Sequence, residues 1–313
     1  MKPLRIATRG SALALWQANH LRQALDRSFG IAAEILVLKT SGDRFVGAAF
    51  DELGIKGVFT KELEDALLDG RADLAVHSMK DVPTEICDAC RVAVVFTRED
   101  PRDALVSRSG LTLAQLPRGA RIGTSSLRRA SQLLRFRSDF EIVEIRGNVD
   151  TRLRKLDSGE YDGVILAKAG IDRLDLASRI TEILSPEVML SAVGQGALGV
   201  EYLDPRGDEF PFLHEMGDPE TIRAVQAERA LLAGLQGGCR LPLGAWARFQ
   251  GGELVIDACV LSADGKESLR QHGSTARTAP EEPRSLGRRV ANELLVAGAD
   301  RLLRLAGRSV ASS

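Results

Sequence analysis

Residues 4–39 read LRIATRGSALALWQANHLRQALDRSFGIAAEILVLK, and this stretch determines the fold class. LRIAT is a short apolar run typical of a buried strand. Ser11 is an N-cap residue, and apolar side chains at helical spacing predict a helix from Ala12 to Phe29 that Gly30 ends. AEILVLK predicts a second strand. A strand, a helix and a strand in this order predict parallel pairing, with the helix on one face of the sheet.

The same alternation continues and then restarts, which indicates two α/β lobes of similar construction. In the first lobe, a helix near Thr60 to Asp69 precedes the strand DLAVHS. In the second, strands are predicted at ARIG, EIVEI and DGVILA, with helices at 125–137 and 149–157. The segments EDPRDALVS, around Pro101, and VGQGALGVEY, ending at Tyr202, combine breaker residues with extended runs. We interpret them as crossings between the lobes, and two crossings predict a hinge.

After Pro219 the pattern changes to that of a smaller α+β domain. It predicts a helix from Glu220 to Leu235, a hairpin made of LGAWARF and ELVIDACVLS, and a final helix through Leu302. We therefore predict an α/β protein with two lobes and a C-terminal α+β domain. The predicted division is 1–99 with 200–217 for the first domain, 100–199 for the second and 218–313 for the third.

The composition bounds the function. The chain has 313 residues, of which 27% are charged, and a formal net charge of -1, so it lacks the overall basicity usual in nucleic-acid binders. No apolar stretch is long enough to span a membrane and no secretory signal is present, which predicts a cytoplasmic protein. The four cysteines do not make a disulfide framework, so reduced thiols are expected at Cys87, Cys90, Cys239 and Cys259. No metal site is predicted.

Two strand-to-helix segments of the second lobe carry hydroxyls and arginines. GTSSLRRASQLLRFR begins at Gly123, and IRGNVDTRLRKL begins at Ile145. Free backbone N–H groups at a helix start, hydroxyls and guanidinium forks can converge on one anion. Taken singly, these arginines could instead be solvated helix faces. Together they predict a polyanionic ligand, with these candidate residues: Thr124, Ser125, Ser126, Arg128, Arg129, Arg146, Gly147 and Arg152.

The first lobe adds two further segments at strand ends. Thr8-Arg9-Gly10-Ser11 joins a strand to a helix, and HSMKDVP places Lys80 and Asp81 after another strand. Asp81 beside Lys80 could be only a surface ion pair. Alternatively, a carboxylate in a cleft lined with cations could stabilise a positively charged intermediate.

The stretch LQGGCRLPLG, at 235–244, predicts a loop that presents Cys239. Glycines allow a sharp turn there, and Pro242 discourages a helix from continuing. Two rival functions stay open at this point. One is an anion-binding module without catalysis, and the other is a cysteine-nucleophile hydrolase, which would need a histidine within reach of the thiol.

The ordered set of motifs resembles one family. TRGSALALWQ, KGVFTKELEDALL, DLAVHSMKDVP, REDPRDALVS, RIGTSSLRRASQL, IRGNVDTRLRKLD, AVGQGALGVE and the GGC loop cover most of the chain and are similar to the porphobilinogen deaminase (hydroxymethylbilane synthase) family. The resemblance implies two lobes like those of periplasmic binding proteins and a third domain that carries a dipyrromethane cofactor, thioether-linked through Cys239. It also implies that the protein is a monomer, which is the usual form in this family.

The implied activity belongs to tetrapyrrole (haem) biosynthesis. Four molecules of the small substrate porphobilinogen are condensed head to tail onto the primer with loss of ammonia, and water then releases hydroxymethylbilane. By this resemblance the catalytic residues are Asp81, Lys80, Arg9 and Gln195. The cofactor-binding residues, besides Cys239, are Ser78, Lys80, Asp81, Thr124, Ser125, Ser126, Arg128, Arg129, Arg146 and Gly147. The substrate-binding residues are Arg9, Ser11, Phe59, Arg146, Arg152 and Arg173.

Overall fold

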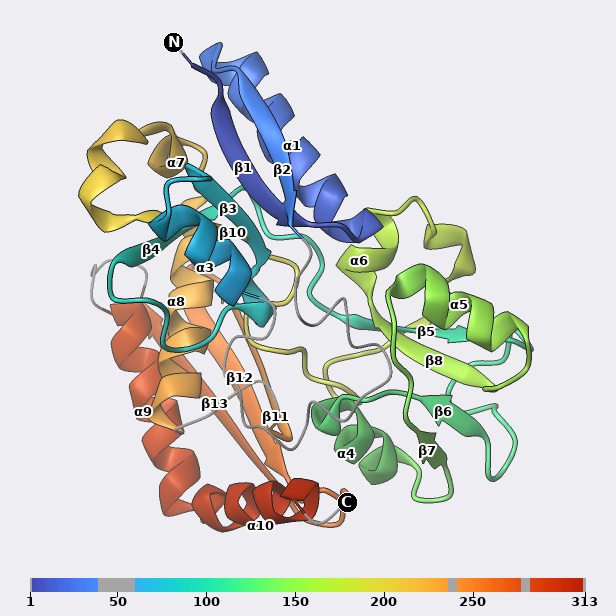
Figure 1. Ribbon diagram of the computed structural model, residues 1–313. Helices are drawn as coiled ribbons and strands as arrows, with labels where there is room; N and C mark the ends of the chain where they lie inside the picture. The colour runs from blue at the N-terminus through green and yellow to red at the C-terminus, as the bar shows by residue number, and fades with distance from the viewer. Residues whose placement is uncertain (1, 39–59, 236–240, 277–281, 312–313) are drawn as a thin grey trace. The chain divides into compact units, whose positions relative to one another are not determined.

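The computed structural model describes residues 2–38, 60–235, 241–276 and 282–311 (Figure 1). The predictions for Phe59 and Cys239 lie outside these ranges. By its internal contacts the chain divides into two compact units, Met1–Arg98 with Ala197–Ile222 and Glu99–Gly196 with Arg223–Ser313. One unit boundary, between 196 and 197, falls inside the predicted crossing VGQGALGVEY, and another, between 98 and 99, lies at the start of EDPRDALVS.

The first unit is built on a five-stranded sheet with the order β2-β1-β3-β10-β4. Strands β1 and β2, and β1 and β3, are parallel as predicted, whereas β10 is antiparallel to both of its neighbours. The bounds are β1 Leu4–Arg9, β2 Ala33–Leu38, β3 Leu74–Ser78, β4 Cys90–Val95 and β10 Leu198–Leu203.

Helices cover both faces of this sheet. Figure 1 shows α1 (Ala12–Phe29) running along β1 and β2, where Leu21 and Leu25 are buried against Ile6. Helix α3 (Lys61–Leu68) packs Leu63 and Leu67 into a separate cluster, and α7 (Phe212–Glu215) is a single turn. The predicted ends of α1 are confirmed. Ser11 accepts a hydrogen bond from the Ala14 amide at 3.3 Å, and Gly30 takes the left-handed conformation that ends the helix.

The second unit contains a sheet of the same design, with the order β7-β6-β8-β5-β9. Strand β6 pairs in parallel with β7 and β8, and β5 is antiparallel to β8 and β9. In each lobe, the fourth strand in the order of the sheet, β10 or β5, is the antiparallel one, and it directly follows a crossing. The bounds are β5 Asp103–Ser107, β6 Arg121–Gly123, β7 Glu141–Val143, β8 Gly163–Ala167, β9 Glu182–Ile183, α4 Leu127–Phe136, α5 Val149–Asp157 and α6 Lys168–Asp172.

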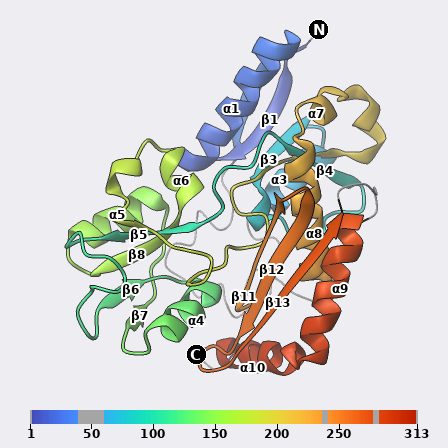
Figure 2. The same ribbon diagram turned by 180° about the vertical axis from the view of Figure 1, so that it is seen from behind.

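The smaller α+β part follows α8 (Pro219–Gly234), which begins at the end of the first unit. Its antiparallel sheet consists of β11 Leu243–Gln250, β12 Glu253–Leu261 and β13 Ser268–Ala276. Figure 2 shows α8 and α9 (Glu282–Val296) alongside this sheet, with a shared core that includes Leu231, Ile256 and Val290. The predicted hairpin and fold class are confirmed. The predicted single final helix is wrong, because Gly298 separates α9 from α10 (Ala299–Ala311).

Candidate active site

The strand ends of the first lobe bring several predicted residues to one edge of the sheet. Strands β1 and β3 are parallel and end at Arg9 and Ser78, while the antiparallel β10 begins opposite Ser78. The Met79 amide donates to the carbonyl of Ala197 at 3.0 Å, which ties the turn after β3 to the start of β10. The segments around Arg9 and Lys80 therefore share this edge.

Local hydrogen bonds hold the backbone at this edge. Thr8 Oγ1 donates to the Ala14 carbonyl at 3.1 Å, and Gln17 Nε2 donates to Ser78 Oγ at 2.7 Å. Met79–Asp81 forms one turn of 3-10 helix in which Met79 is buried and Asp81 is exposed. The turn thus has an apolar anchor and presents a carboxylate to solvent.

The second lobe has a corresponding edge, where β6 ends at Gly123 and β5 begins at Asp103 opposite Ala167. Hydroxyls shape the turn after β6. Ser125 Oγ donates to the carbonyl of Ile145 at 2.6 Å, and Thr124 Oγ1 accepts from the Ser126 amide at 3.2 Å. Ser126 then caps α4 by accepting from the amide of Arg129.

Arg128 and Arg129 are neither solvated nor on an open helix face, because their side chains are 6% and 8% exposed. Both bind the carboxylate of Asp103, Arg128 through Nη1 at 2.7 Å and Arg129 through Nη2 at 2.7 Å. Burial would raise the pKa of Asp103, but the two guanidiniums outweigh it and hold that pKa far below its usual range. The sequence analysis missed this buried acid.

The second strand-to-helix segment leaves its arginines more accessible. Arg146 Nε donates to Glu144 Oε1 at 2.6 Å, and 40% of the Arg146 side chain is exposed. Arg152 Nε donates to the Gly147 carbonyl at 2.8 Å. Gly147 has φ of 112°, and a Cβ there would lie 2.7 Å from the side chain of Thr151, so only glycine fits.

Arg173 and Gln195 bind the two crossing segments to each other. Arg173 Nε donates to Glu99 Oε1 at 2.8 Å, and its Nη2 donates to the carbonyl of Gly196 at 2.9 Å. Gln195 Nε2 donates to the Pro101 carbonyl at 2.6 Å and to Asp103 Oδ1 at 3.1 Å. The acids in REDPRDA were the only sequence signal for these contacts, because hydrogen bonds between residues 23 to 94 positions apart leave no local pattern.

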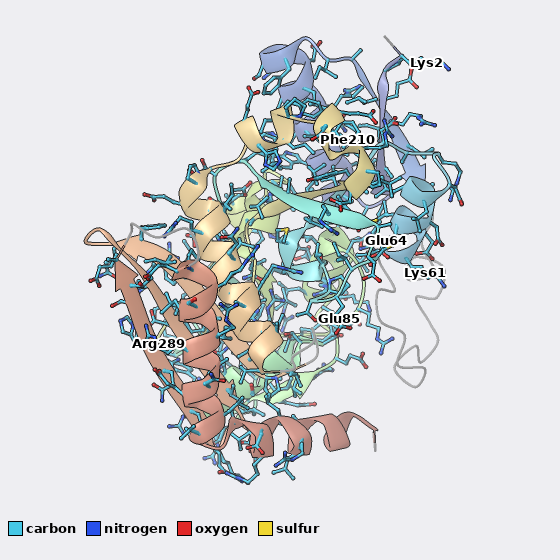
Figure 3. The ribbon with its side chains drawn as sticks, turned by 90° about the vertical axis from the view of Figure 1, so that its left-hand side faces the viewer. Lys2, Lys61, Glu64, Glu85, Phe210 and Arg289 are labelled. Carbon is cyan, nitrogen blue, oxygen red and sulfur yellow. The ribbon has the colours of Figure 1, made fainter. Side chains whose placement is uncertain are left out.

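A second buried polar cluster lies beneath the first-lobe edge. His77, on β3, contacts Glu201 on β10 with 2.9 Å between Nε2 and Oε2. Burial and then the charge of Glu201 raise the pKa of Glu64. Glu64 belongs to α3, as does Lys61 (Figure 3). This cluster contains none of the predicted site residues.

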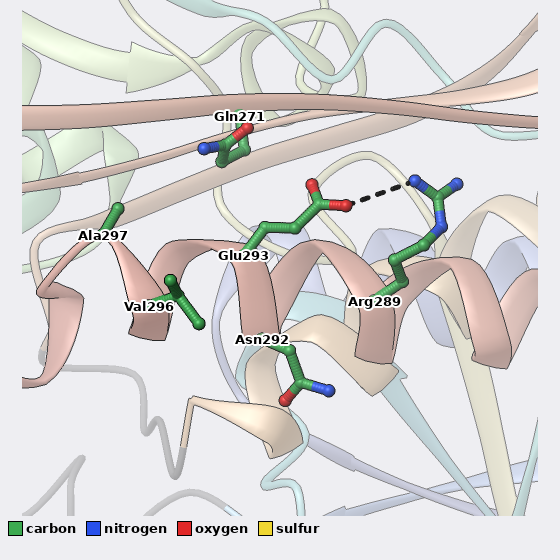
Figure 4. A pocket seen from close by; sticks show the side chains of 6 residues that line it. All are labelled: Gln271, Arg289, Asn292, Glu293, Val296 and Ala297. Carbon is green, nitrogen blue, oxygen red and sulfur yellow. Dashed lines mark hydrogen bonds and ion pairs between the residues drawn. The ribbon is translucent and has the colours of Figure 1, made fainter.

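The remaining features of the second unit are structural or peripheral. Arg137 stacks over Phe140 and donates to carbonyls of 113–117, so it braces a loop. Figure 4 shows a surface pocket of about 570 Å³ between α9 and β13, lined by Gln271 and by α9 residues that include the Arg289–Glu293 ion pair.

Within the described ranges, no three His, Cys, Asp or Glu side chains are grouped so as to hold a metal ion. Nor does any helix there have the length and apolarity to cross a membrane.

Comparisons with known proteins cover nearly the whole chain. A family model described as "Porphobilinogen deaminase, dipyromethane cofactor binding domain" matches residues 4–209, and one for the C-terminal domain of the same family matches 222–296. A porphobilinogen deaminase of Syntrophobacter fumaroxidans is 45% identical over 96% of each chain. One from Nitratidesulfovibrio vulgaris is 46% identical over 97% of this chain and 96% of its own length.

Among solved structures, the likeness is more distant. The periplasmic aliphatic sulphonate binding protein SsuA of Escherichia coli has a TM-score of 0.40 and 13% identity, covering 75% of this chain and 71% of its own. The periplasmic VFT2 domain of Bordetella pertussis BvgS has a TM-score of 0.40 and 15% identity, covering 68% and 86%. We infer no function from scores of this size.

Proposed function

The chain belongs to the porphobilinogen deaminase family, and from this premise we propose how its residues divide the work of the reaction. Its activity is that of a hydroxymethylbilane synthase, which joins four porphobilinogen molecules head to tail with loss of ammonia and releases the product with water. We propose that the two strand-end edges described above provide the binding and catalytic side chains. We further propose that the chain acts as a cytoplasmic monomer.

The charge of the arginine cluster supports binding of the dipyrromethane cofactor, whose pyrrole rings carry carboxylates. Arg128 and Arg129 together share a single protein carboxylate, so the buried cluster keeps an excess positive charge. Burying an uncompensated charge is costly, and an anionic ligand would offset the cost. This excess charge is the structural observation that carries the proposal.

We propose that Cys239 is the attachment point of the cofactor and that the third domain spans 218–313. The sequence places Cys239 behind a glycine pair, between α8 and β11. When bound, the dipyrromethane supplies a free pyrrole carbon to which units are added. Thr124, Ser125 and Ser126 contribute neutral donors beside the arginines, and Ser78 and Lys80 contribute from the first lobe.

Asp81 is proposed to stabilise positive charge. Its carboxylate is exposed at the end of a turn whose Met79 anchor is buried, so it can accept a hydrogen bond from a pyrrole N–H. The charge on a substrate pyrrole nitrogen grows as ammonia leaves, and a fixed carboxylate would lower that barrier. Lys80 and Arg9, at the same edge, would bind the acidic side arms of the substrate.

Arg146 is proposed to bind substrate carboxylates, together with Ser11, Phe59, Arg152 and Arg173. Its partner Glu144 is 59% exposed, so a ligand carboxylate can replace Glu144 without leaving a buried charge unpaired. Arg173 would in addition act with Gln195 at the crossings, between a first domain of 1–99 with 200–217 and a second of 100–199.

The activity is tested by incubating the purified chain with porphobilinogen and measuring both substrate consumed and ammonia released. One ammonia for each porphobilinogen is expected. Arg146→Gln should raise KM about tenfold, because it removes a charge-assisted contact worth about 1.5–3 kcal/mol. The matched control is Arg154→Gln, because Arg154 is an exposed arginine of α5 that contacts Thr151. The KM of the Arg154→Gln variant should equal that of the parent chain. A chain that consumes no porphobilinogen would contradict the proposed function.

A further inference from the structure

Asp103 is a buried carboxylate that the family resemblance did not assign. It is 0% exposed and stands at the first position of β5. Oδ2 accepts from Arg128 Nη1 at 2.7 Å. Oδ1 accepts from Arg129 Nε at 3.1 Å, from Arg129 Nη2 at 2.7 Å and from Gln195 Nε2 at 3.1 Å. One carboxylate therefore joins both arginines of α4 to the return crossing.

The remaining contacts of the two guanidiniums are neutral. Arg128 Nη1 also donates to the Leu190 carbonyl at 2.6 Å, and Arg129 Nη1 donates to the Ile165 carbonyl at 3.0 Å. Carbonyl oxygens offer an acceptor without a full charge, so Asp103 dominates the electrostatics that orient both side chains. Because its two oxygens bind different arginines, the carboxylate also sets the spacing between the two guanidiniums.

We propose that Asp103 is a positioning residue for the reaction, which fixes the orientation of Arg128 and Arg129 toward carboxylates of the cofactor and links both arginines through Gln195 to the crossing. This inference rests on the proposed function. Asp103 itself is 0% exposed, so it would act on a ligand only through the two arginines. The competing explanation is that Asp103 only neutralises buried charge, in which case its loss would reduce folding but not ligand binding.

The test measures cofactor loading of the full chain, purified from cells that do not make porphobilinogen. The loading rate is followed by intact mass at increasing porphobilinogen concentrations, and the folded fraction is measured by circular dichroism. Asp103→Asn should raise the half-saturating porphobilinogen concentration about tenfold or more in the folded fraction, because the arginines lose their fixed geometry. A purely structural role would lower the amount of folded protein and leave that concentration unchanged, which would overturn the inference.

Two further variants make the test decisive. Asp139→Asn removes a carboxylate that pairs with Arg137 at 2.6 Å near the surface of the same unit, and its half-saturating concentration should equal that of the parent chain. Gln195→Met keeps the charge and approximate size but removes the hydrogen bonds from Gln195 to Asp103 and to the Pro101 carbonyl, so it remains informative if Asp103→Asn does not fold. We expect it to raise the half-saturating concentration about threefold or more. An unchanged value in Gln195→Met would also overturn the inference.

The parent chain separates a failure of the proposed function from a failure of the role of Asp103. If the parent chain gains no adduct, the proposed function itself is wrong. If the parent chain loads normally and Asp103→Asn loads with the same half-saturating concentration, only the role of Asp103 is wrong.

Discussion

Two carboxylates of this chain have opposite environments, and their environments set their roles. Asp103 is enclosed and bound by two arginines, so its negative charge is committed to the protein. Asp81 is exposed at the end of a short turn, so its charge is available to a ligand. The family resemblance singled out Asp81 alone, because the partners of Asp103 lie at least 25 positions away in the sequence.

Asp81→Asn should preserve cofactor loading while it removes most of the turnover. The amide keeps the size of the side chain but lacks the negative charge that stabilises the reacting pyrrole, so a loss of about 100-fold or more in kcat is expected. Loading is read from the intact mass and turnover from ammonia release. The control is Asp88→Asn, because Asp88 is an exposed carboxylate of the same lobe. A kcat for Asp81→Asn within a factor of two of the parent would remove Asp81 from the mechanism.

Asp73 offers a test of electrostatics in the first lobe. Burial would raise the pKa of Asp73, but hydrogen bonds from Arg5 and Arg206 outweigh burial and lower that pKa from 3.8 to about 2. A depressed pKa means that the ionised form stabilises the folded state above the ordinary pKa. This contribution is lost as the pH falls from 3.8 through about 2.

Asp73→Asn should therefore lower the free energy of unfolding by about 1–2 kcal/mol near neutral pH. The difference in the free energy of unfolding between Asp73→Asn and the parent chain should shrink as the pH falls from 3.8 through about 2. Urea unfolding of both chains at several pH values measures this difference. Asp69→Asn, which removes an exposed pair with Arg71, should have little effect throughout. A difference for Asp73→Asn that stays constant into acid would show that the carboxylate charge is not responsible.

At the scale of elements, local signals predicted helices well where both ends carry a cap. Helix α1 begins after Ser11, whose side chain caps it, and ends before Gly30. Helix α5 also has the predicted bounds, although Asn148 at its start makes no capping hydrogen bond with its side chain. Strand β13 was missed because SLRQHGSTA has no regular alternation of apolar residues, and its place comes from pairing with β12. The antiparallel direction of β5 and β10 was missed for a similar reason, since it follows from the path of the crossings rather than from the strands themselves.

The turn between β12 and β13 packs tightly against α4, the helix that carries the arginine pair. Gly265 has φ of 71°, and a Cβ there would lie 2.4 Å from the carbonyl oxygen of Ser131 and 2.6 Å from the amide of Arg135. Both atoms belong to the backbone, so they cannot rotate away. Gly251, in the preceding turn, has φ of 59° with no atom near an added Cβ. The two glycines thus share a left-handed conformation and differ in steric contact.

Gly265→Ala should destabilise the protein more than Gly251→Ala. Both variants place an alanine in the left-handed backbone conformation, which destabilises the folded state by about 1–2 kcal/mol. The steric contact in Gly265→Ala adds about 1–3 kcal/mol. Chemical unfolding of the two variants beside the parent chain gives the comparison. Equal destabilisation would mean that the turn does not pack against α4 as described. Arg135, on α4, also donates through Nη1 to the carbonyl of Lys266, next to Gly265. Because Gly265→Ala would disturb this contact with the helix that carries Arg128 and Arg129, it should also slow cofactor loading.

At the scale of the whole molecule, the repeated sheet design explains where function is expected. Each lobe has four strands that run in one direction and one antiparallel strand, which follows a crossing and begins beside the carboxyl end of a neighbouring strand. In each lobe, the predicted residues gather at that edge or at the crossing next to it. The general position of the proposed site thus follows from the βαβ pattern, whereas the buried Asp103 network required the structure.

The central claim is that the chain carries a pyrrole primer on Cys239. The most direct measurement is the intact mass of the purified chain, before and after incubation with porphobilinogen, with Cys239→Ser as the control. The account predicts a chain heavier than its sequence by one two-pyrrole adduct, and a Cys239→Ser chain with the unmodified mass. An unmodified parent chain after incubation, or an adduct that persists in Cys239→Ser, would contradict it.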